Sequence, residues 1–132
     1  MNEPFYVVVR IQLAASEDKL PQLAEQLTNR FSRPLSRLEI EPYDKFENGH
    51  EISFWVYFED VTTNSAVKEV SQELGAGWIY TPSEADDGYS EGLWNDEFGE
   101  FVIPEAFFCV IYSFYPERNA KMLAEMEFEE LP

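Results

Sequence analysis

The sequence predicts an α+β domain of two layers, in which two helices pack on one face of a sheet. Several segments alternate apolar and polar residues with the period of two that a β-strand requires. Two others repeat apolar residues three and four positions apart, as amphipathic helices do. The order of these segments is strand, helix, strand, strand, helix, and one further strand would complete a two-layer sandwich. The 132 residues are predicted to form a single domain, 1–132.

The first strand is predicted at residues 5–13, where the apolar residues from Phe5 to Leu13 at odd positions share one face. A helix follows, with Ser16 as its expected N-cap and acidic residues in its first turn, close to the positive end of the helix dipole. Pro34 lies beyond its end. The apolar stripe of this helix comprises Leu20, Leu23, Ala24, Leu27 and Phe31.

A second, weaker strand is expected at residues 36–44, where Pro42 indicates an edge position or the end of the strand. The sequence at 47–49, Glu-Asn-Gly, is typical of a hairpin turn. Residues 51–59 have the clearest strand pattern, and a second helix is predicted at about 63–74. The N-cap candidates of this helix are Thr62, Thr63 and Asn64, and its apolar stripe comprises Ala66, Val67, Val70 and Leu74.

Two segments compete for the last strand of the sandwich. Residues 78–81 follow the second helix directly, whereas residues 106–115 are longer and more apolar, and both are expected to be extended. The polar residues 82–105 between them are predicted to be a long acidic-aromatic insertion loop, and residues 117–127 a short C-terminal helix. The predicted fold is therefore a ferredoxin-like two-layer sandwich, βαββαβ, with this insertion before the last strand.

The chain is strongly acidic, with 26 Asp and Glu against 9 Lys and Arg, a net charge of −17 and a pI near 4.2. A hydrophobic content of 45% and an aromatic content of 16% still allow a packed core. Proteins that bind nucleic acid directly need a basic surface, and anionic membranes repel acidic chains. We therefore expect neither a direct nucleic-acid ligand nor a membrane partner.

No residue pattern in the chain indicates catalysis. A single Cys and a single His exclude an intramolecular disulfide and a zinc site built from these residue types, and no phosphate-binding loop, GxGxxG or HExxH motif occurs. Cys109 is expected in the core and His50 in a turn. Residues 86–91 do not fit the ligand spacing of an EF-hand. We expect a non-enzymatic protein without a cofactor and, because no signal peptide or membrane span is visible, a cytoplasmic location.

The acidic residues are concentrated in one part of the chain. No Lys or Arg occurs between Lys68 and Arg118, a stretch that contains eleven Asp and Glu with interleaved aromatic residues. One interpretation is a solvated loop whose aromatic residues dock onto the domain. The other is a recognition surface for a basic partner, since Tyr and Trp are common anchors at interfaces. The candidate contact residues are Asp86, Asp87, Tyr89, Glu91, Trp94, Asp96 and Glu97.

The face of the predicted sheet that points away from the helices is also apolar. A two-layer sandwich normally leaves this face polar, and a contiguous exposed apolar patch is unusual for a monomer. The insertion and the C-terminal segment, a second copy of the chain or a partner could cover it. The residues expected there are Tyr6, Val8, Trp55, Tyr57, Phe108, Val110, Tyr112 and Phe114.

Together these features favour an inhibitory protein that binds a basic partner such as a toxin or nuclease domain, because nucleases need Lys and Arg to hold phosphate. In size, charge and lack of a catalytic motif the chain is similar to bacterial immunity proteins that neutralise toxic nucleases. The likeness is one of general character, no family motif is matched, and no inhibitory residue is carried over from it.

Three other hypotheses stay open. The first is a nucleic-acid mimic whose carboxylates imitate phosphates, and the second is an adaptor with another basic partner. The third is a dimeric ferredoxin-like small enzyme or ligand-binding sensor, in which the apolar sheet face forms the dimer interface or the wall of a pocket. The mass in solution, monomer or homodimer, would separate this last hypothesis from the inhibitory protein.

Overall fold

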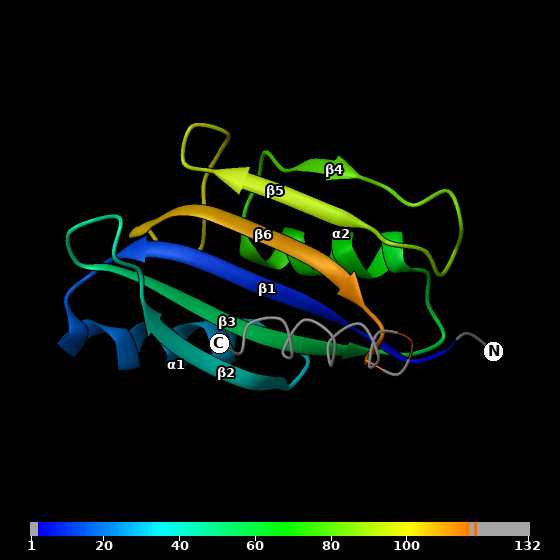
Figure 1. Cartoon of the computed structure of the whole chain (residues 1–132), viewed down its shortest axis with the longest axis horizontal. Helices are drawn as coiled ribbons and strands as arrows, with labels where there is room; N and C mark the ends of the chain where they lie inside the picture. The colour runs from blue at the N-terminus through cyan, green and yellow to red at the C-terminus, as the bar shows by residue number, and fades with distance from the viewer. Residues whose placement is uncertain (1–2, 117, 119–132) are drawn as a thin grey trace, which may run out of the picture.

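A computed structural model describes residues 3–116 and residue 118 of the chain. Its centre is a sheet of six strands in the order β2-β3-β1-β6-β5-β4, in which every neighbouring pair is antiparallel (Figure 1). The strands are β1 (Phe5–Ala14), β2 (Leu35–Pro42), β3 (Gly49–Phe58), β4 (Ile79–Thr81), β5 (Glu91–Asn95) and β6 (Ala106–Phe114). The helices in the described part of the chain are α1 (Leu20–Arg30), which follows a 3₁₀ turn η1 (Glu17–Lys19), and α2 (Thr63–Leu74).

This architecture corrects the predicted βαββαβ ferredoxin-like sandwich, which is wrong. Two strands, β4 and β5, lie between α2 and β6, so the structure is mostly sheet with six strands and, within the described residues, two helices. The segment 82–105 is not one long loop, because β5 pairs with β4 on one side and with β6 on the other. The residues at 78–81 and 106–115 are both extended, as predicted, but β5 separates them.

The acidic composition of the residues around β5 is the reason that this strand is not predicted from the sequence. Along Glu91–Asn95 the residues Gly92 and Trp94 are buried, whereas the residues at positions 91, 93 and 95 are only half-buried. One of the two inward positions is a glycine, so the apolar alternation that identifies a half-buried strand is nearly absent. A Cβ atom at Gly92 would lie 3.1 Å from Cγ1 of Ile111 on the neighbouring strand, a tight contact that glycine avoids.

The register of the central strands decides which side chains share a face. β1 pairs with β3 along its whole length, from Phe5 opposite Phe58 to Ala14 opposite Gly49, and with β6 on its other edge. Alternate residues therefore point to opposite faces. Those facing the helices form the hydrophobic core, which includes Phe5, Val7, Val9, Ile11, Ile52, Phe54, Val56, Phe58, Cys109 and Ile111.

Both helices cover the same face of the sheet (Figure 1). The predicted apolar stripe of α2 is confirmed, and so are the first four residues of the stripe of α1, because these residues are buried. Phe31, the last residue of the predicted stripe, is also buried but lies just beyond the end of α1. α2 spans the predicted residues, and the Thr62 side chain caps it by accepting a hydrogen bond of 3.1 Å from the Ser65 amide. α1 begins later than predicted: Ser16 precedes the 3₁₀ turn and makes no capping bond with its side chain.

The other face of the sheet, which we call the open face, has neither helix against it (Figure 1). Its register brings together the eight residues predicted to gather there. Segment 82–105 does not cover it, because β4 and β5 extend the sheet sideways. The predicted helix at 117–127 lies outside the described residues, apart from Arg118. No helix within the described residues is long and apolar enough to cross a membrane.

Candidate functional site

The structure divides the predicted contact residues between two ends of β5. Asp86, Asp87 and Tyr89 precede the strand, whereas Asp96 and Glu97 follow it. A five-residue strand is roughly 16 Å long, so these two groups do not form a single patch. Glu91 lies at the first end, beside Tyr89.

Trp94 lies in the core and is 1% exposed. Its ring packs 4.3 Å from the centroid of Phe101, on the helix-covered side of the sheet. The side chain therefore stabilises the fold, and it offers no exposed surface to a partner in this structure. The sequence predicted Trp94 as an anchor because the missing strand assignment left its direction undetermined.

The loop that precedes β5, residues 82–90, is held in place by several hydrogen bonds. The Asn64 side chain exchanges two bonds of 2.8 Å with the backbone of Ser83, at the start of α2. The Thr63 amide donates to the carbonyl of Asp86 at 2.9 Å. At the other end of the loop the Ser90 amide donates to Oγ of Ser113 at 3.0 Å. This loop is preorganised, which lowers the entropic cost of any interaction it makes.

Asp87 is already paired within the chain. The Arg118 guanidinium lies 2.7 Å from Oδ2 of Asp87 and 2.5 Å from Oε2 of Glu3. The hydrogen bond and charge of Arg118 hold the pKa of Asp87 below its ordinary value. Asp86 is exposed, so Asp86 is the more accessible carboxylate of the two.

Tyr89 connects this loop to the open face. Its side chain is 58% exposed, and its ring stacks on Tyr112 of β6 with the centroids 6.3 Å apart. Its hydroxyl donates a hydrogen bond of 3.2 Å to Oε1 of Glu91. Partial burial of the hydroxyl and the negative charge of Glu91 raise the pKa of Tyr89 to about 12. The hydroxyl is therefore a hydrogen-bond donor throughout the physiological range.

A set of aromatic side chains, which we call the aromatic strip, crosses the open face. Trp55 of β3 lies at its middle, 5.0 Å from the Tyr6 ring and 5.1 Å from the Phe114 ring. Tyr6 also meets Tyr57 edge to face at 5.6 Å. Most of these side chains are half-buried. The aromatic strip comprises Tyr6, Trp55, Tyr57, Tyr89, Tyr112 and Phe114.

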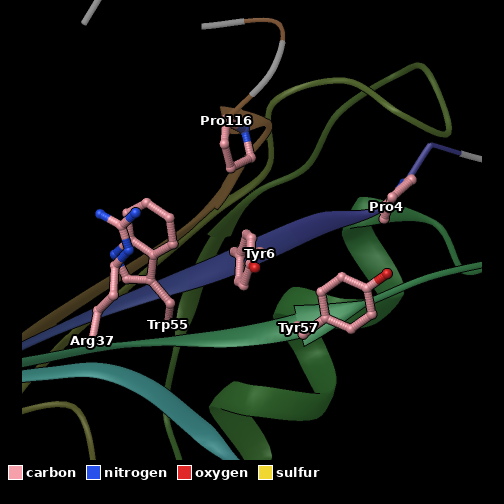
Figure 2. A pocket seen from close by; sticks show the side chains of 6 residues that line it. All are labelled: Pro4, Tyr6, Arg37, Trp55, Tyr57 and Pro116. Atoms are coloured by element: carbon pink, nitrogen blue, oxygen red, sulfur yellow. The ribbon is translucent and has the colours of Figure 1, made fainter. Parts of the chain in front are cut away.

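A hollow of about 280 Å³ extends from Trp55, at the middle of the aromatic strip, to Tyr57, and is lined by Pro4, Tyr6, Arg37, Trp55, Tyr57 and Pro116. Figure 2 shows the Arg37 guanidinium beside the Trp55 ring, with Tyr6 between Trp55 and Tyr57. The guanidinium carbon is 4.2 Å from the centroid of the Trp55 ring, which is a cation–π contact.

Sequence reasoning placed Tyr6, Trp55 and Tyr57 on this face but missed Arg37. The register between β2 and β3 shifts between Ser36 and Glu39, and Arg37 has a φ of 52° there. At such an irregularity the side chains no longer alternate regularly between the two faces of the sheet, so the sequence pattern cannot show on which face Arg37 lies.

Acidic side chains border the hollow at Tyr57. The Tyr57 hydroxyl donates a hydrogen bond of 3.2 Å to Oε2 of Glu59. Burial, together with the negative charges of Glu59 and Asp60, raises the pKa of Tyr57. Both carboxylates therefore lie close enough to contribute a negative potential at this end of the strip.

The residues considered for catalysis have structural surroundings. Cys109 lies in the core, as predicted, and burial raises the pKa of its thiol well above its ordinary value. His50 is the second residue of β3 rather than a turn residue, is largely buried, and its Nδ1 lies 3.1 Å from the carbonyl of Asn48. Among the described residues, no group of three or more His, Cys, Asp and Glu could hold a metal ion.

No protein-family model, curated protein or solved structure matches this chain.

Proposed function

We propose that this chain is a binding protein for a basic protein, and that it acts as an inhibitor of that partner, in the manner of an immunity protein that neutralises a nuclease-type toxin. The observation that carries the proposal is a half-exposed aromatic strip on a chain with a net charge of −17. Aromatic side chains supply contact area at interfaces, and the negative potential selects and steers a positively charged partner.

The open face and the loop 82–90 offer a continuous surface for such a partner. Tyr89 joins the two through its stacking on Tyr112. The exposed carboxylate of Asp86 and the Glu91 carboxylate held by Tyr89 lie at the same end of β5. Asp96 and Glu97 lie at the opposite end, so we expect them to contribute to long-range attraction more than to direct contact.

The proposal is tested by capturing basic proteins at low ionic strength and titrating each purified candidate by calorimetry. We expect a saturable one-to-one complex that weakens between about 0.05 M and 0.3 M salt, as screening of a charged interface requires. If the partner is a nuclease, adding the chain should suppress its activity. The proposal is contradicted if no candidate forms a stoichiometric complex.

Charge reversal locates the interface. The double variant Asp86→Lys, Glu91→Lys should abolish most of the binding, and Asp96→Lys, Glu97→Lys is a matched control with the same change in net charge. A larger loss of affinity in the control variant would show that the interface lies at the other end of β5. Equal binding to many unrelated basic proteins would favour the nucleic-acid mimic instead.

The hollow at Trp55 favours a second candidate function, binding of a small molecule against the open face. Its volume of about 280 Å³ lies just below the range of about 300–1,000 Å³ that is typical of ligand pockets, and aromatic residues line it. A homodimer that closes the open face over this hollow would support that function, and equilibrium sedimentation distinguishes it from a monomer with a protein partner.

A further inference from the structure

We infer that the hollow at Trp55 is a receptor for a guanidinium or ammonium side chain of the basic partner, and that Arg37 occupies this receptor in the free protein. The inference rests on the proposed function, because it specifies the chemistry by which that partner is recognised. It is carried by the arrangement of rings in the hollow, by the surrounding charge and by the way in which Arg37 is held.

The three rings of the hollow present differently inclined surfaces. The planes of Tyr6 and Trp55 are inclined by 55°, and those of Tyr6 and Tyr57 by 67°. Ring faces and edges therefore line the hollow from more than one direction (Figure 2). Aromatic faces attract cations through their negative quadrupole, and Trp does so most strongly.

The guanidinium of Arg37 already lies over the face of the Trp55 ring. The contact of Arg37 at 4.2 Å shows that the ring is accessible to a planar cation and large enough to hold one. Among the described residues that line the hollow, Arg37 is the single charged one, and the carboxylates of Glu59 and Asp60 lie near the Tyr57 ring. An anionic ligand would meet these carboxylates and the net negative charge of the chain, whereas a cation is attracted by both.

The contact of Arg37 with the Trp55 ring is weak enough for a cation of the partner to displace Arg37. Among the residues that the structure describes, Arg37 has no hydrogen-bond or ion-pair partner, and its side chain is exposed. Arg33 provides a contrast, because it lies 4.1 Å over the Phe58 ring but is also fixed by an ion pair of 2.7 Å to Glu69. Arg37 can leave its ring without breaking such a pair, and Arg33 cannot.

The inference is tested with an arginine nonapeptide as the probe and a glutamate nonapeptide as its acidic counterpart. Calorimetry at low salt compares the wild type with Arg37→Ala and with the matched control Arg33→Ala, which removes the same charge elsewhere. If Arg37 competes for the receptor, Arg37→Ala should bind the basic probe about two- to fivefold more tightly than Arg33→Ala does.

The indole N–H resonance of Trp55 gives a local readout, assigned by comparison with Trp55→Phe. We expect this resonance to shift with the basic probe and not with the acidic one. Trp55→Phe should retain part of the affinity, because it keeps an aromatic face, whereas Trp55→Leu should lose the gain produced by Arg37→Ala. The near-ultraviolet circular dichroism of each variant checks that it is folded.

The outcomes separate this inference from the proposed function. If the basic probe binds wild type, Arg37→Ala and Arg33→Ala equally and leaves the Trp55 resonance unchanged, the inference is wrong, while recognition of a basic partner elsewhere on the surface stands. If the basic probe does not bind at low salt, the inference is wrong, while the proposed function is decided separately by the capture and titration of basic proteins. Tighter binding of the acidic probe would overturn the inference and make Arg37 an anion anchor.

Discussion

Phe54 and Trp55 are neighbours in β3, yet their side chains lie in different surroundings. Phe54 points to the helices, is 0% exposed and packs edge to face on Phe31 at 5.5 Å. Trp55 points to the open face, is half-buried and meets Tyr6, Phe114 and the guanidinium of Arg37. The two faces of the sheet are both apolar, but α1 and α2, the helices of the described residues, cover only the first.

This difference assigns separate tasks to the two faces. On the helix-covered face, dispersion and the exclusion of water hold the fold together, and little change in volume is tolerated. On the open face, similar side chains remain partly accessible and can be buried further by a partner. The predictions below test this division, from the largest expected effect to the smallest.

Phe54→Ala should produce the largest loss of stability. Removing a fully buried ring leaves a cavity among helix-facing residues, and the free energy of unfolding should fall by about 3–5 kcal/mol. Urea unfolding followed by circular dichroism measures this change. A loss below about 1 kcal/mol would show that the helix-covered face is not the principal core.

Trp55→Ala should reduce the free energy of unfolding by less, about 1–2 kcal/mol, because the ring is only half-buried in the free protein. The same denaturation experiment measures it. A loss equal to that of Phe54→Ala would mean that the open face is a second core rather than a recognition surface. The comparison is sharpest for these two residues because they belong to the same strand.

Thr62→Ala should cost about 1 kcal/mol of unfolding free energy, because the Ser65 amide loses its capping acceptor at the start of α2. Thr62→Ser keeps a hydroxyl and serves as the control. Urea denaturation should place the serine variant near the wild type. An alanine variant as stable as the wild type would show that the cap does not help to hold the helix cover on the sheet.

Tyr89→Phe should have the smallest effect, confined to alkaline pH. The pKa of Tyr89 is raised from 10.0 to about 12, so its contribution is fully present below pH 10 and is lost as the pH rises through about 12. The wild type should therefore lose more stability than Tyr89→Phe between these values. The midpoints of urea unfolding at pH 10 and at about pH 12 measure this loss of stability for both proteins. The absorbance of tyrosinate follows the ionisation of Tyr89. If the wild type and Tyr89→Phe lost equal stability over this pH range, the interaction between Tyr89 and Glu91 would be contradicted.

The local pattern of the sequence was sufficient for most elements. The alternation in β1 and β3 predicted which residues share a face, and the helical spacing after Thr62 predicted α2, because these periodicities follow from backbone geometry alone. It also predicted that the second face would be apolar. These features depend on neighbours in the chain and need no knowledge of what packs against them.

Tertiary structure decided the parts that matter most for a site. β5 exists because it pairs with β4 and β6, and this pairing buries Trp94 and separates Asp86 from Asp96. The placement of Arg37 over Trp55 follows from an irregular register between β2 and β3. Contacts between residues far apart in the chain set both features, and a periodicity read along one segment contains no information about its distant partner.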